Sequence, residues 1–355
     1  MMLGKSYGNY ITMKLGTIYY LIPDIFQRKF NLREFYRHLK RGEGSSYLHQ
    51  CKHVNKRAIG GIKVFYQHCK QLTELGFDAV PLAMGNFDGN LYYPEIDSKH
   101  ISEVGFNLNE NDVVVATEFS PYDAIQFNHC KKVMFAQSWI YLKPRFKPED
   151  QDKSYRQLGY DYVISCGEYI SRTIRGLHNE ECVTVSNGID GSVFYPDEKL
   201  REPNRVMCMP RKNRDDIETI KSIVSRQCSN VTFVDVDGVP EAEIALAYRK
   251  SDILLSTGYP EGLPLPPLEA MCSGSVVVGF AGRGGRQYMI DGKTALVAED
   301  GDCISAAEAL VKVLNDRDLK ELLRKNAQNE MQQYTLKAMQ QRVGQFFKQV
   351  EADLN

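Results

Sequence analysis

The 355-residue chain lacks several features that would place it in common functional classes. No apolar run approaches the roughly 20 residues of a membrane-spanning helix, and residues 1–16 lack the apolar core of a signal peptide. The nine cysteines form no C-x-x-C pair, which predicts reduced thiols rather than a disulfide framework or a zinc site. With 44 Lys and Arg against 45 Asp and Glu, the chain has no bulk charge to attract nucleic acid. We therefore expect a cytoplasmic protein without a nucleic-acid partner.

Signals for a metal site are also weak. The seven histidines form no H-x-x-x-H or H-E-x-x-H pair, and His49, His53 and His68 are expected to be solvated. Asp235 and Asp237 in DVDG could form a metal-binding D-x-D, but carboxylates after a strand more often serve as turn and cap residues. The single Trp139 is expected to lie in the core, with a position facing the cleft after a first-domain strand as the alternative. The sequence thus predicts no metal and no cofactor.

The chain does show an alternation of short apolar runs with helix-period segments, which is typical of parallel sheets covered by helices. In the first half a helix is expected at residues 60–76, where apolar residues recur at helical spacing and Gly76 ends the pattern. Strands are expected at residues 17–25, 77–84, 112–119, 131–139, 161–169 and 182–188.

Residues 185–205 interrupt this rhythm with glycines, prolines and charges, as a linker would. The alternation then restarts, with strands expected at 205–210, 230–236, 252–257, 275–280 and 294–299 and helices at 214–227 and 241–250. The fold class is therefore α/β with two Rossmann-like, doubly wound domains, residues 1–187 and 188–335. Residues 336–355 are expected to form a helix that crosses back to the first domain.

The stretch EGLPLPPLEAMCSG, residues 261–274, follows a predicted strand, and ligands of open α/β sheets bind beyond the carboxyl ends of strands. Pro266 and Pro267 suit the first turn of a helix and Gly274 suits its end, so a helix amino terminus is expected to offer an anion site. Glu269 is expected in the first turn. There it could accept hydrogen bonds from both hydroxyls of a ribose, or it could only complement the helix dipole.

This stretch resembles the E-x7-E signature of retaining glycosyltransferases of family 4. Three further stretches occur in that family's order: Gly60-Gly61 before a long helix, VSNGID (Asn187, Gly188, Asp190), and GRGGRQYMIDG at 282–292. The resemblance covers most of residues 56–315. It implies the GT-B fold, with two Rossmann-like domains facing across a cleft, and a metal-independent retaining transfer from a UDP-, GDP- or TDP-sugar. The acceptor would be a glycan, a lipid-linked or a small molecule, in polysaccharide or glycoconjugate biosynthesis.

By position, the resemblance assigns Glu269 to the donor ribose and Glu261 to the donor sugar. Donor-binding positions would be Gly60, Gly61, Gly262, Leu263, Pro264 and Leu265. The cations after strand 205–210, Arg211 with Lys212 or Arg214, would neutralise the leaving diphosphate. The chain departs from the family pattern in having Pro264 in place of a loop glycine, Thr117 and Glu118 in place of a strand-ending histidine, and Gln287 and Tyr288 near an expected glutamate.

Two other enzyme classes stay open at this point. The strand VVVGF followed by GRGG is similar to a dinucleotide-binding fingerprint, with Glu299 or Asp300 as the ribose-binding acid of a nicotinamide-dependent dehydrogenase. A nucleotide-sugar epimerase would have a similar two-domain architecture.

The insertion at residues 24–58 is unusually long for the connection between a strand and its helix. It mixes cations with aromatic residues: Arg28, Lys29, Arg33, Arg37, Lys40 and Arg41 with Phe26, Phe30, Phe35 and Tyr36. Such a mixture is typical of a helix that binds a membrane surface or an anionic acceptor. A solvated structural insertion is the alternative.

Overall fold

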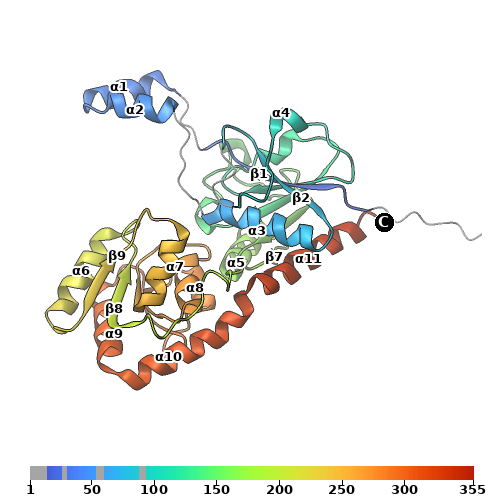
Figure 1. Cartoon of the computed structure of the whole chain (residues 1–355). Coiled ribbons are helices and arrows are strands. Elements are labelled where there is room, and N and C mark those ends of the chain that lie inside the picture. Colours follow the sequence, from blue (N-terminus) through green and yellow to red (C-terminus); the bar gives the residue numbers. More distant parts are fainter. Residues whose placement is uncertain (1–13, 26–29, 53–59, 88–92) are drawn as a thin grey trace, which may run out of the picture. The chain divides into compact units, whose positions relative to one another are not determined.

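The computed structural model describes residues 14–25, 30–52, 60–87 and 93–355 (Figure 1). The chain divides into two compact units. Unit 1 comprises Met1–Ala116, Tyr122–Lys132 and Val343–Asn355, and unit 2 comprises Thr117–Pro121 and Val133–Arg342. The predicted domain boundary between residues 187 and 188 separates the strands of the first sheet from those of the second, whereas the two units divide the chain at other positions. The predicted domain boundaries therefore stay a prediction.

The first sheet has seven strands in the order β3-β2-β1-β4-β5-β6-β7. Its strands are β1 (Thr17–Ile22), β2 (Asp78–Ala83), β3 (Lys99–His100), β4 (Val113–Thr117), β5 (Lys131–Ala136), β6 (Tyr162–Ser165) and β7 (Val183–Thr184). The pairings of β1 with β2 and β4, of β2 with β3, and of β6 with β5 and β7 are all parallel. Strands buried on both faces have near-continuous apolar sequences, and all five residues of β4 are buried.

Helix α3 (Gly60–Glu74) follows the first strand and confirms the predicted helix, with Gly76 just beyond it at φ +88°. The helix packs on β1 and β2 and is buried around more of its circumference than the apolar pattern predicts. His68, expected in solvent, is fully buried, and its Nδ1 lies 3.0 Å from the Tyr20 hydroxyl. Burial disfavours the charged imidazolium and lowers the pKa of His68 to about 3, so the expectation of a solvated His68 was wrong. His53 lies outside the described residues.

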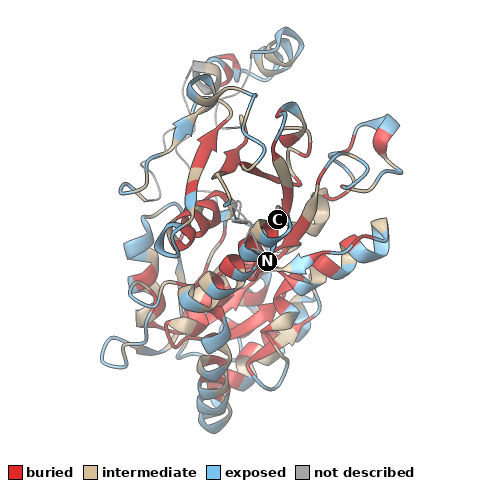
Figure 2. Ribbon diagram, turned by 90° about the vertical axis from the view of Figure 1, so that its right-hand side faces the viewer, coloured by how far each residue is buried: buried red, intermediate tan, exposed pale blue. Residues whose placement is uncertain are grey.

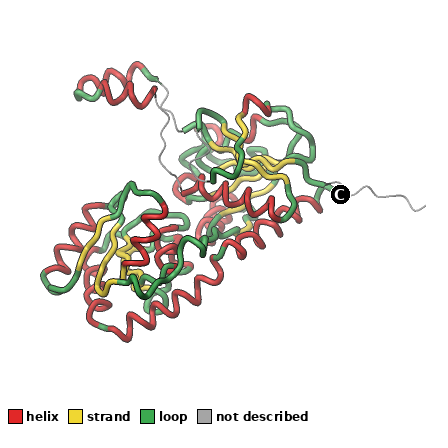
Figure 3. Tube along the Cα trace, in the orientation of Figure 1, coloured by secondary structure: helices red, strands yellow, loops and turns green. Residues whose placement is uncertain are grey.

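The second sheet has five parallel strands in the order β12-β11-β10-β8-β9. They are β8 (Glu202–Cys208), β9 (Thr232–Asp235), β10 (Ser251–Ser256), β11 (Val276–Phe280) and β12 (Ala295–Ala298). The helices that follow them are α6 (Arg214–Ser225), α7 (Glu241–Lys250), α8 (Leu265–Cys272), α9 (Cys303–Asn315) and α10 (Arg317–Glu330). Figure 3 shows how helices and strands alternate along the chain. The two parallel sheets confirm the predicted α/β class.

The remaining elements are five helices and five 3-10 turns of the described residues. The helices are α1 (Leu32–Lys40), α2 (Gly44–Lys52), α4 (Ile101–Val104), α5 (Glu168–His178) and α11 (Leu336–Ala352), and the 3-10 turns are η2 (Ala124–Gln126), η3 (Trp139–Tyr141), η4 (Pro148–Asp150), η5 (Gly284–Gln287) and η6 (Met331–Tyr334). In unit 1 the Phe347 ring of α11 lies 6.4 Å from that of Phe77. None of the helices in the described part of the chain is long and apolar enough to span a bilayer.

The core of the second sheet is built from the apolar faces that the sequence pattern predicts. Ile217, Ile220 and Val224 of α6 pack with strand residues such as Val206 and Ile253, and all five are fully buried. Figure 2 shows the strands largely in the colour of buried residues. Burial of each such side chain stabilises the fold by about 1.5 to 3 kcal/mol.

One ionic cluster lies inside unit 2. Asp252, 4% exposed, pairs through Oδ1 with Arg324 Nη2 at 2.7 Å and through Oδ2 with Lys320 Nζ at 2.8 Å. Burial by itself would raise the pKa of Asp252, but hydrogen bonds from Lys320, the Asn204 amide and Arg324 hold it below its usual value. A carboxyl with a depressed pKa stabilises the fold above its unfolded pKa, and this contribution is lost as the pH falls.

Replacing Asp252 with Asn should destabilise the protein by roughly 3 to 5 kcal/mol, because two buried cations lose their counter-charge. Urea denaturation followed by circular dichroism measures this effect. The control is Glu202→Gln, which breaks the partly exposed pair with Arg205 (2.8 Å) and should cost no more than about 1 kcal/mol. Equal urea concentrations at the midpoint of unfolding for the two variants would contradict the prediction.

Candidate functional site

The candidate site forms where the strand order of the second sheet reverses. The chain passes from β8 to β9 on one side and then returns to place β10 on the other side of β8. Loops that leave the carboxyl ends of the two strands at such a switch point diverge and create a ligand crevice. Here these loops are residues 209–213 and 257–264. The first loop contains the predicted cations Arg211 and Lys212, and the second contains the predicted carboxylate Glu261.

Lys212 and Glu261 meet at this point, with Nζ and Oε1 2.6 Å apart. The Lys212 side chain is 43% exposed and that of Glu261 is 29% exposed, so both groups can reach a ligand. Arg211 and Arg214 are also exposed, Arg211 on the same loop and Arg214 as the first residue of α6. The structure thus brings one predicted cation directly to the first glutamate of the E-x7-E stretch.

Two residues that the sequence analysis missed connect these loops. The Asn213 side chain donates through Nδ2 to the carbonyls of Thr257 (2.7 Å) and Tyr259 (3.0 Å). The Tyr259 hydroxyl in turn donates to Asp216 Oδ2 at 2.9 Å. An asparagine in a strand-to-helix loop is a signal that could have found the first link, because Asn readily adopts the left-handed backbone and bonds to nearby backbone groups.

Helix α8 begins at Leu265, carries its prolines in the first turn and is followed by Gly274 at φ +80°, as expected. Because Pro266 and Pro267 lack amide hydrogens, Leu265 is the only donor among the first three helical residues. Glu269 is the fifth residue of α8, so its expected place in the first turn was wrong. The Tyr248 hydroxyl donates to its carboxylate at 3.5 Å.

Within unit 2 the loop at Glu261 is enclosed by two other strand-end loops. A Cβ on Gly262 would lie 2.1 Å from the Gln137 carbonyl oxygen after β5. A Cβ on Gly284, after β11, would lie 1.5 Å from the Gly262 carbonyl oxygen. Only glycine permits such close approach, so both positions are sterically required.

Trp139 lies against the same loop, and the expectation of a core tryptophan was wrong. Its side chain is partly exposed, and Nε1 donates to the Glu261 carbonyl at 3.1 Å. The Arg283 guanidinium lies 4.7 Å from the centre of the Trp139 ring and donates to the Tyr169 hydroxyl at 3.2 Å. The alternative position after a first-domain strand fits better, but the sequence pattern could not reveal its partner, because Trp139 and Glu261 are 122 residues apart.

Gln287 and Tyr288, which stand near the glutamate that the family resemblance would predict, form hydrogen bonds within the protein. Gln287 accepts the Glu168 amide at 2.9 Å and donates to the Tyr334 hydroxyl at 3.1 Å. The buried Tyr288 hydroxyl donates to the Pro264 carbonyl at 2.5 Å. The stretch 282–292 therefore supports the loop before α8.

The dinucleotide-fingerprint alternative receives no support from the same stretch. The glycines of GRGG lead into the four-residue turn η5 instead of the helix that a pyrophosphate site requires. Glu299 pairs with Arg286 at 2.7 Å, and Asp300 accepts the Gly282 amide at 3.0 Å.

Other predicted positions lie elsewhere. Gly60 and Gly61 are the first residues of α3 in unit 1. Asp235 pairs with Lys221 at 2.6 Å. Within the described ranges, no group of three or more His, Cys, Asp or Glu side chains is placed to hold a metal ion.

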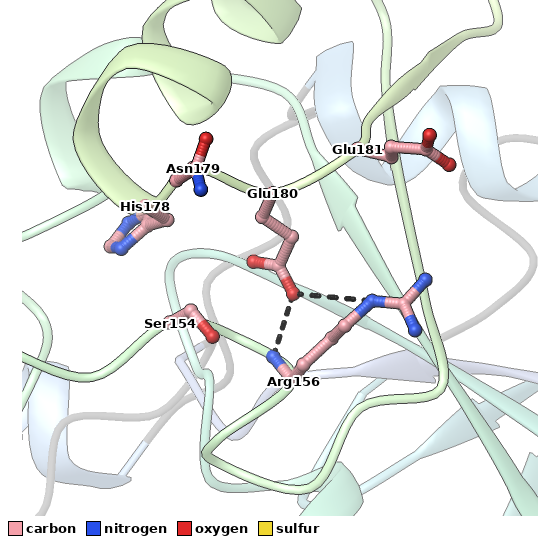
Figure 4. A pocket seen from close by; sticks show the side chains of 6 residues that line it. All are labelled: Ser154, Arg156, His178, Asn179, Glu180 and Glu181. Atoms are coloured by element: carbon pink, nitrogen blue, oxygen red, sulfur yellow. Dashed lines mark hydrogen bonds and ion pairs between the residues drawn. The ribbon is translucent and has the colours of Figure 1, made fainter.

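A pocket of about 370 Å³ lies near the end of α5 (Figure 4). It is lined by Ser154, Arg156, His178, Asn179, Glu180 and Glu181, none of which is a predicted site residue. Glu180 accepts the Arg156 amide at 2.8 Å. These contacts are internal to the pocket wall, and the pocket is separate from the residues around Glu261.

Glu118 follows β4, the strand at which the order of the first sheet reverses. It is 3% exposed, and its Oε2 accepts the Gln137 amide at 2.8 Å. Burial raises the pKa of Glu118 to about 7, despite opposing hydrogen bonds from the backbone of Gln137, Glu118 and Ser138. Glu118 thus fixes the backbone of Gln137, whose carbonyl oxygen lies against Gly262.

Residues 229–330 match the family Glycosyl transferases group 1. The second half of the chain therefore contains a segment similar to group 1 glycosyltransferases. A curated relative is an alpha-1,6-glucosyltransferase of Actinobacillus pleuropneumoniae, 26% identical over 245 residues, which are 64% of this chain and 71% of the relative. This match supports transfer of a sugar over the epimerase and dehydrogenase alternatives.

Solved structures show the same fold at low identity. Sucrose-phosphate synthase from Thermosynechococcus elongatus matches with a TM-score of 0.66 and 15% identity, covering 95% of this chain and 99% of that one. Anabaena HepE in complex with UDP and glucose matches with a TM-score of 0.65 and 12% identity, covering 94% and 99%. These similarities confirm the GT-B-type fold.

The raised pKa of Glu118 gives a test of its environment. Between the unfolded pKa of about 4.3 and the folded value, only the unfolded chain releases the proton, so stability falls by up to roughly 3 kcal/mol as the pH rises. Glu118→Gln keeps the acceptor for the Gln137 amide and removes the proton. Relative to the parent, its unfolding midpoint should rise between about pH 5 and about pH 8.

Thermal unfolding followed by circular dichroism at both pH values measures this difference. The control is Glu110→Gln at an exposed position. The same pH dependence in parent and Glu118→Gln would show that Glu118 ionises normally.

Proposed function

We propose that the chain is a retaining hexosyltransferase that uses a nucleoside-diphosphate sugar. The observation that carries this proposal is the Lys212–Glu261 pair at the switch point of the second sheet, 2.6 Å apart, in a chain with a group 1 glycosyltransferase domain. Loss of a nucleoside diphosphate places negative charge on the departing phosphate, and a cation beside the sugar position stabilises that charge.

The donor is a UDP-hexose in this proposal. The support is that the HepE structure contains UDP and glucose and that the curated relative is named a glucosyltransferase. Glu261 contacts the hexose, the backbone of residues 262–265 borders it, and Glu269 accepts hydrogen bonds from the ribose hydroxyls. By the family resemblance, Gly60 and Gly61 also bind the donor in this proposal.

The cationic role falls first to Lys212 and then to Arg211 and Arg214. Contact with Glu261 supports this order, because Glu261 binds the sugar in this proposal and Lys212 Nζ lies 2.6 Å from its carboxylate. The transfer is metal-independent and retains the anomeric configuration by attack on the face that the leaving group vacates, without a protein nucleophile. The product is a glycan or glycoconjugate made at the cytoplasmic side.

Lys212→Ala should lower kcat by about tenfold to a hundredfold, because the lysine interacts more strongly with the transition state than with the ground state. Release of UDP from UDP-glucose, with and without an oligosaccharide acceptor and in the presence of EDTA, measures the rate. Arg211→Ala and Arg214→Ala should have smaller effects, and the exposed Lys199→Ala serves as the control. Normal rates in all three site variants would refute the assignment, and activity that requires added manganese would refute metal independence.

The hairpin α1–α2 contacts an anionic acceptor or membrane surface in this proposal. Its interior is formed by Tyr47, which is fully buried and lies 5.9 Å from Phe35. Phe35 thus packs against Tyr47 within the hairpin. In contrast, Leu32, Tyr36 and Leu39 have exposed fractions of 59%, 59% and 48%. These three residues, at helical spacing, form an apolar stripe beside Arg33, Arg37, Lys40 and Arg41. Phe26, Arg28 and Lys29 lie outside the described residues.

Reversal of Arg37, Lys40 and Arg41 to Glu should abolish sedimentation with phosphatidylcholine vesicles that contain about 30% phosphatidylglycerol, since each basic residue near such a surface contributes about 1 kcal/mol. Pure phosphatidylcholine vesicles are the control. If the parent does not sediment and transfer is unchanged in the variant, the hairpin has a structural role only.

A further inference from the structure

Asn213 occupies a position between the two halves of the candidate site. It follows Lys212 directly and precedes α6. Its backbone is left-handed, with φ 51° and ψ 46°. Asparagine adopts this conformation more readily than most other residues with a side chain, so the loop can reverse here without a glycine.

The side chain of Asn213 uses its whole donor capacity on the opposite loop. Nδ2 carries two hydrogens, and its two acceptors are the Thr257 carbonyl at 2.7 Å and the Tyr259 carbonyl at 3.0 Å. Both carbonyls belong to the loop that leads to Glu261. The side chain makes no bond that caps α6, so its role in the structure is to make the two bonds to the opposite loop.

The ion pair beside this bridge cannot hold the loops by itself. Lys212 and Glu261 are both partly exposed, and an ion pair in contact with solvent contributes little to a fixed geometry. It must also open if Lys212 is to bind a diphosphate. The amide bridge, one residue from Lys212 and two from Glu261, remains when the ion pair opens.

We propose that Asn213 is a positioning residue, whose amide holds the loops after β8 and β10 at the separation that places Lys212 beside Glu261. This inference rests on the proposed transferase function for its kinetic consequence. Its structural consequence is independent of that function, because Glu261 also accepts the hydrogen bond from Trp139, the only tryptophan of the chain.

Two substitutions separate the bridge from the backbone conformation. Asn213→Gly keeps the left-handed backbone at no steric cost and removes both bonds. Asn213→Asp keeps the shape but turns a donor into a carboxylate that faces two carbonyls. The matched controls are Asn179→Gly and Asn179→Asp, since Asn179 is also left-handed (φ 49°) and lies exposed at the end of α5.

The first measurement is Trp139 fluorescence in the folded protein without ligand. Both Asn213 variants should shift its emission to longer wavelength and raise its quenching by acrylamide, because the Glu261 loop no longer holds the indole. Both Asn179 variants should match the parent. Parent-like emission in Asn213→Gly would overturn the inference, and a change in Asn213→Asp alone would assign the effect to the added charge and overturn it as well.

The second measurement is turnover of UDP-glucose together with the dissociation constant of UDP. In both Asn213 variants, kcat should fall by about tenfold or more, whereas the dissociation constant of UDP should change by less than about threefold. The reason is that both loops are still present to bind UDP but no longer hold the geometry that the transition state requires. A role in stability alone would shift the melting temperature and leave kcat of the folded protein unchanged, which would overturn the inference. If the parent turns over no UDP-, GDP- or TDP-glucose, the proposed function fails, and the fluorescence result still decides the role of Asn213.

Discussion

The candidate site depends on one topological constraint: β8 lies between β10 and β9 in the second sheet. Because parallel strands end at the same edge, the loops after β8 and β10 begin side by side there, and residues 49 positions apart in the chain come into contact. The exposed ion pair between Lys212 and Glu261 is a consequence of this arrangement and not its cause. Hydrogen bonds from Asn213 and Tyr259 then reduce the freedom that loops of this length would otherwise have.

The parts of the fold that local chemistry decides could be predicted from the sequence. Two prolines set the start of α8, and Gly274, with its positive φ, follows its end. The apolar periodicity located α3, α6 and α7 because each helix has an apolar face to bury. Strand lengths were less predictable: β7 has two residues where seven were expected, because pairing with a neighbour, and not apolar content, decides where a strand ends.

The parts that depend on tertiary neighbours could not be predicted. His68 is buried because Tyr20 of β1 lies opposite, and Trp139 leaves the core because the Glu261 carbonyl is within reach of its indole. In the sequence, Glu118 only stands where the resembled family has a histidine. Its burial and its raised pKa follow from the strands around it, and a position at the end of an apolar strand does not reveal whether a carboxylate is in water or in the core.

Two departures from the family pattern turn out to be in contact. Pro264, which stands where the resembled family has a loop glycine, lacks an amide hydrogen and gives the loop a rigid φ. Tyr288, near the position of an expected glutamate, directs its hydroxyl to the Pro264 carbonyl and is fully buried. A glutamate there could not donate to a carbonyl when ionised, and a glycine at 264 would leave the loop freer to move. The two substitutions therefore make sense together: the tyrosine fixes the rigid turn that the proline introduces, directly before the helix that carries Glu269.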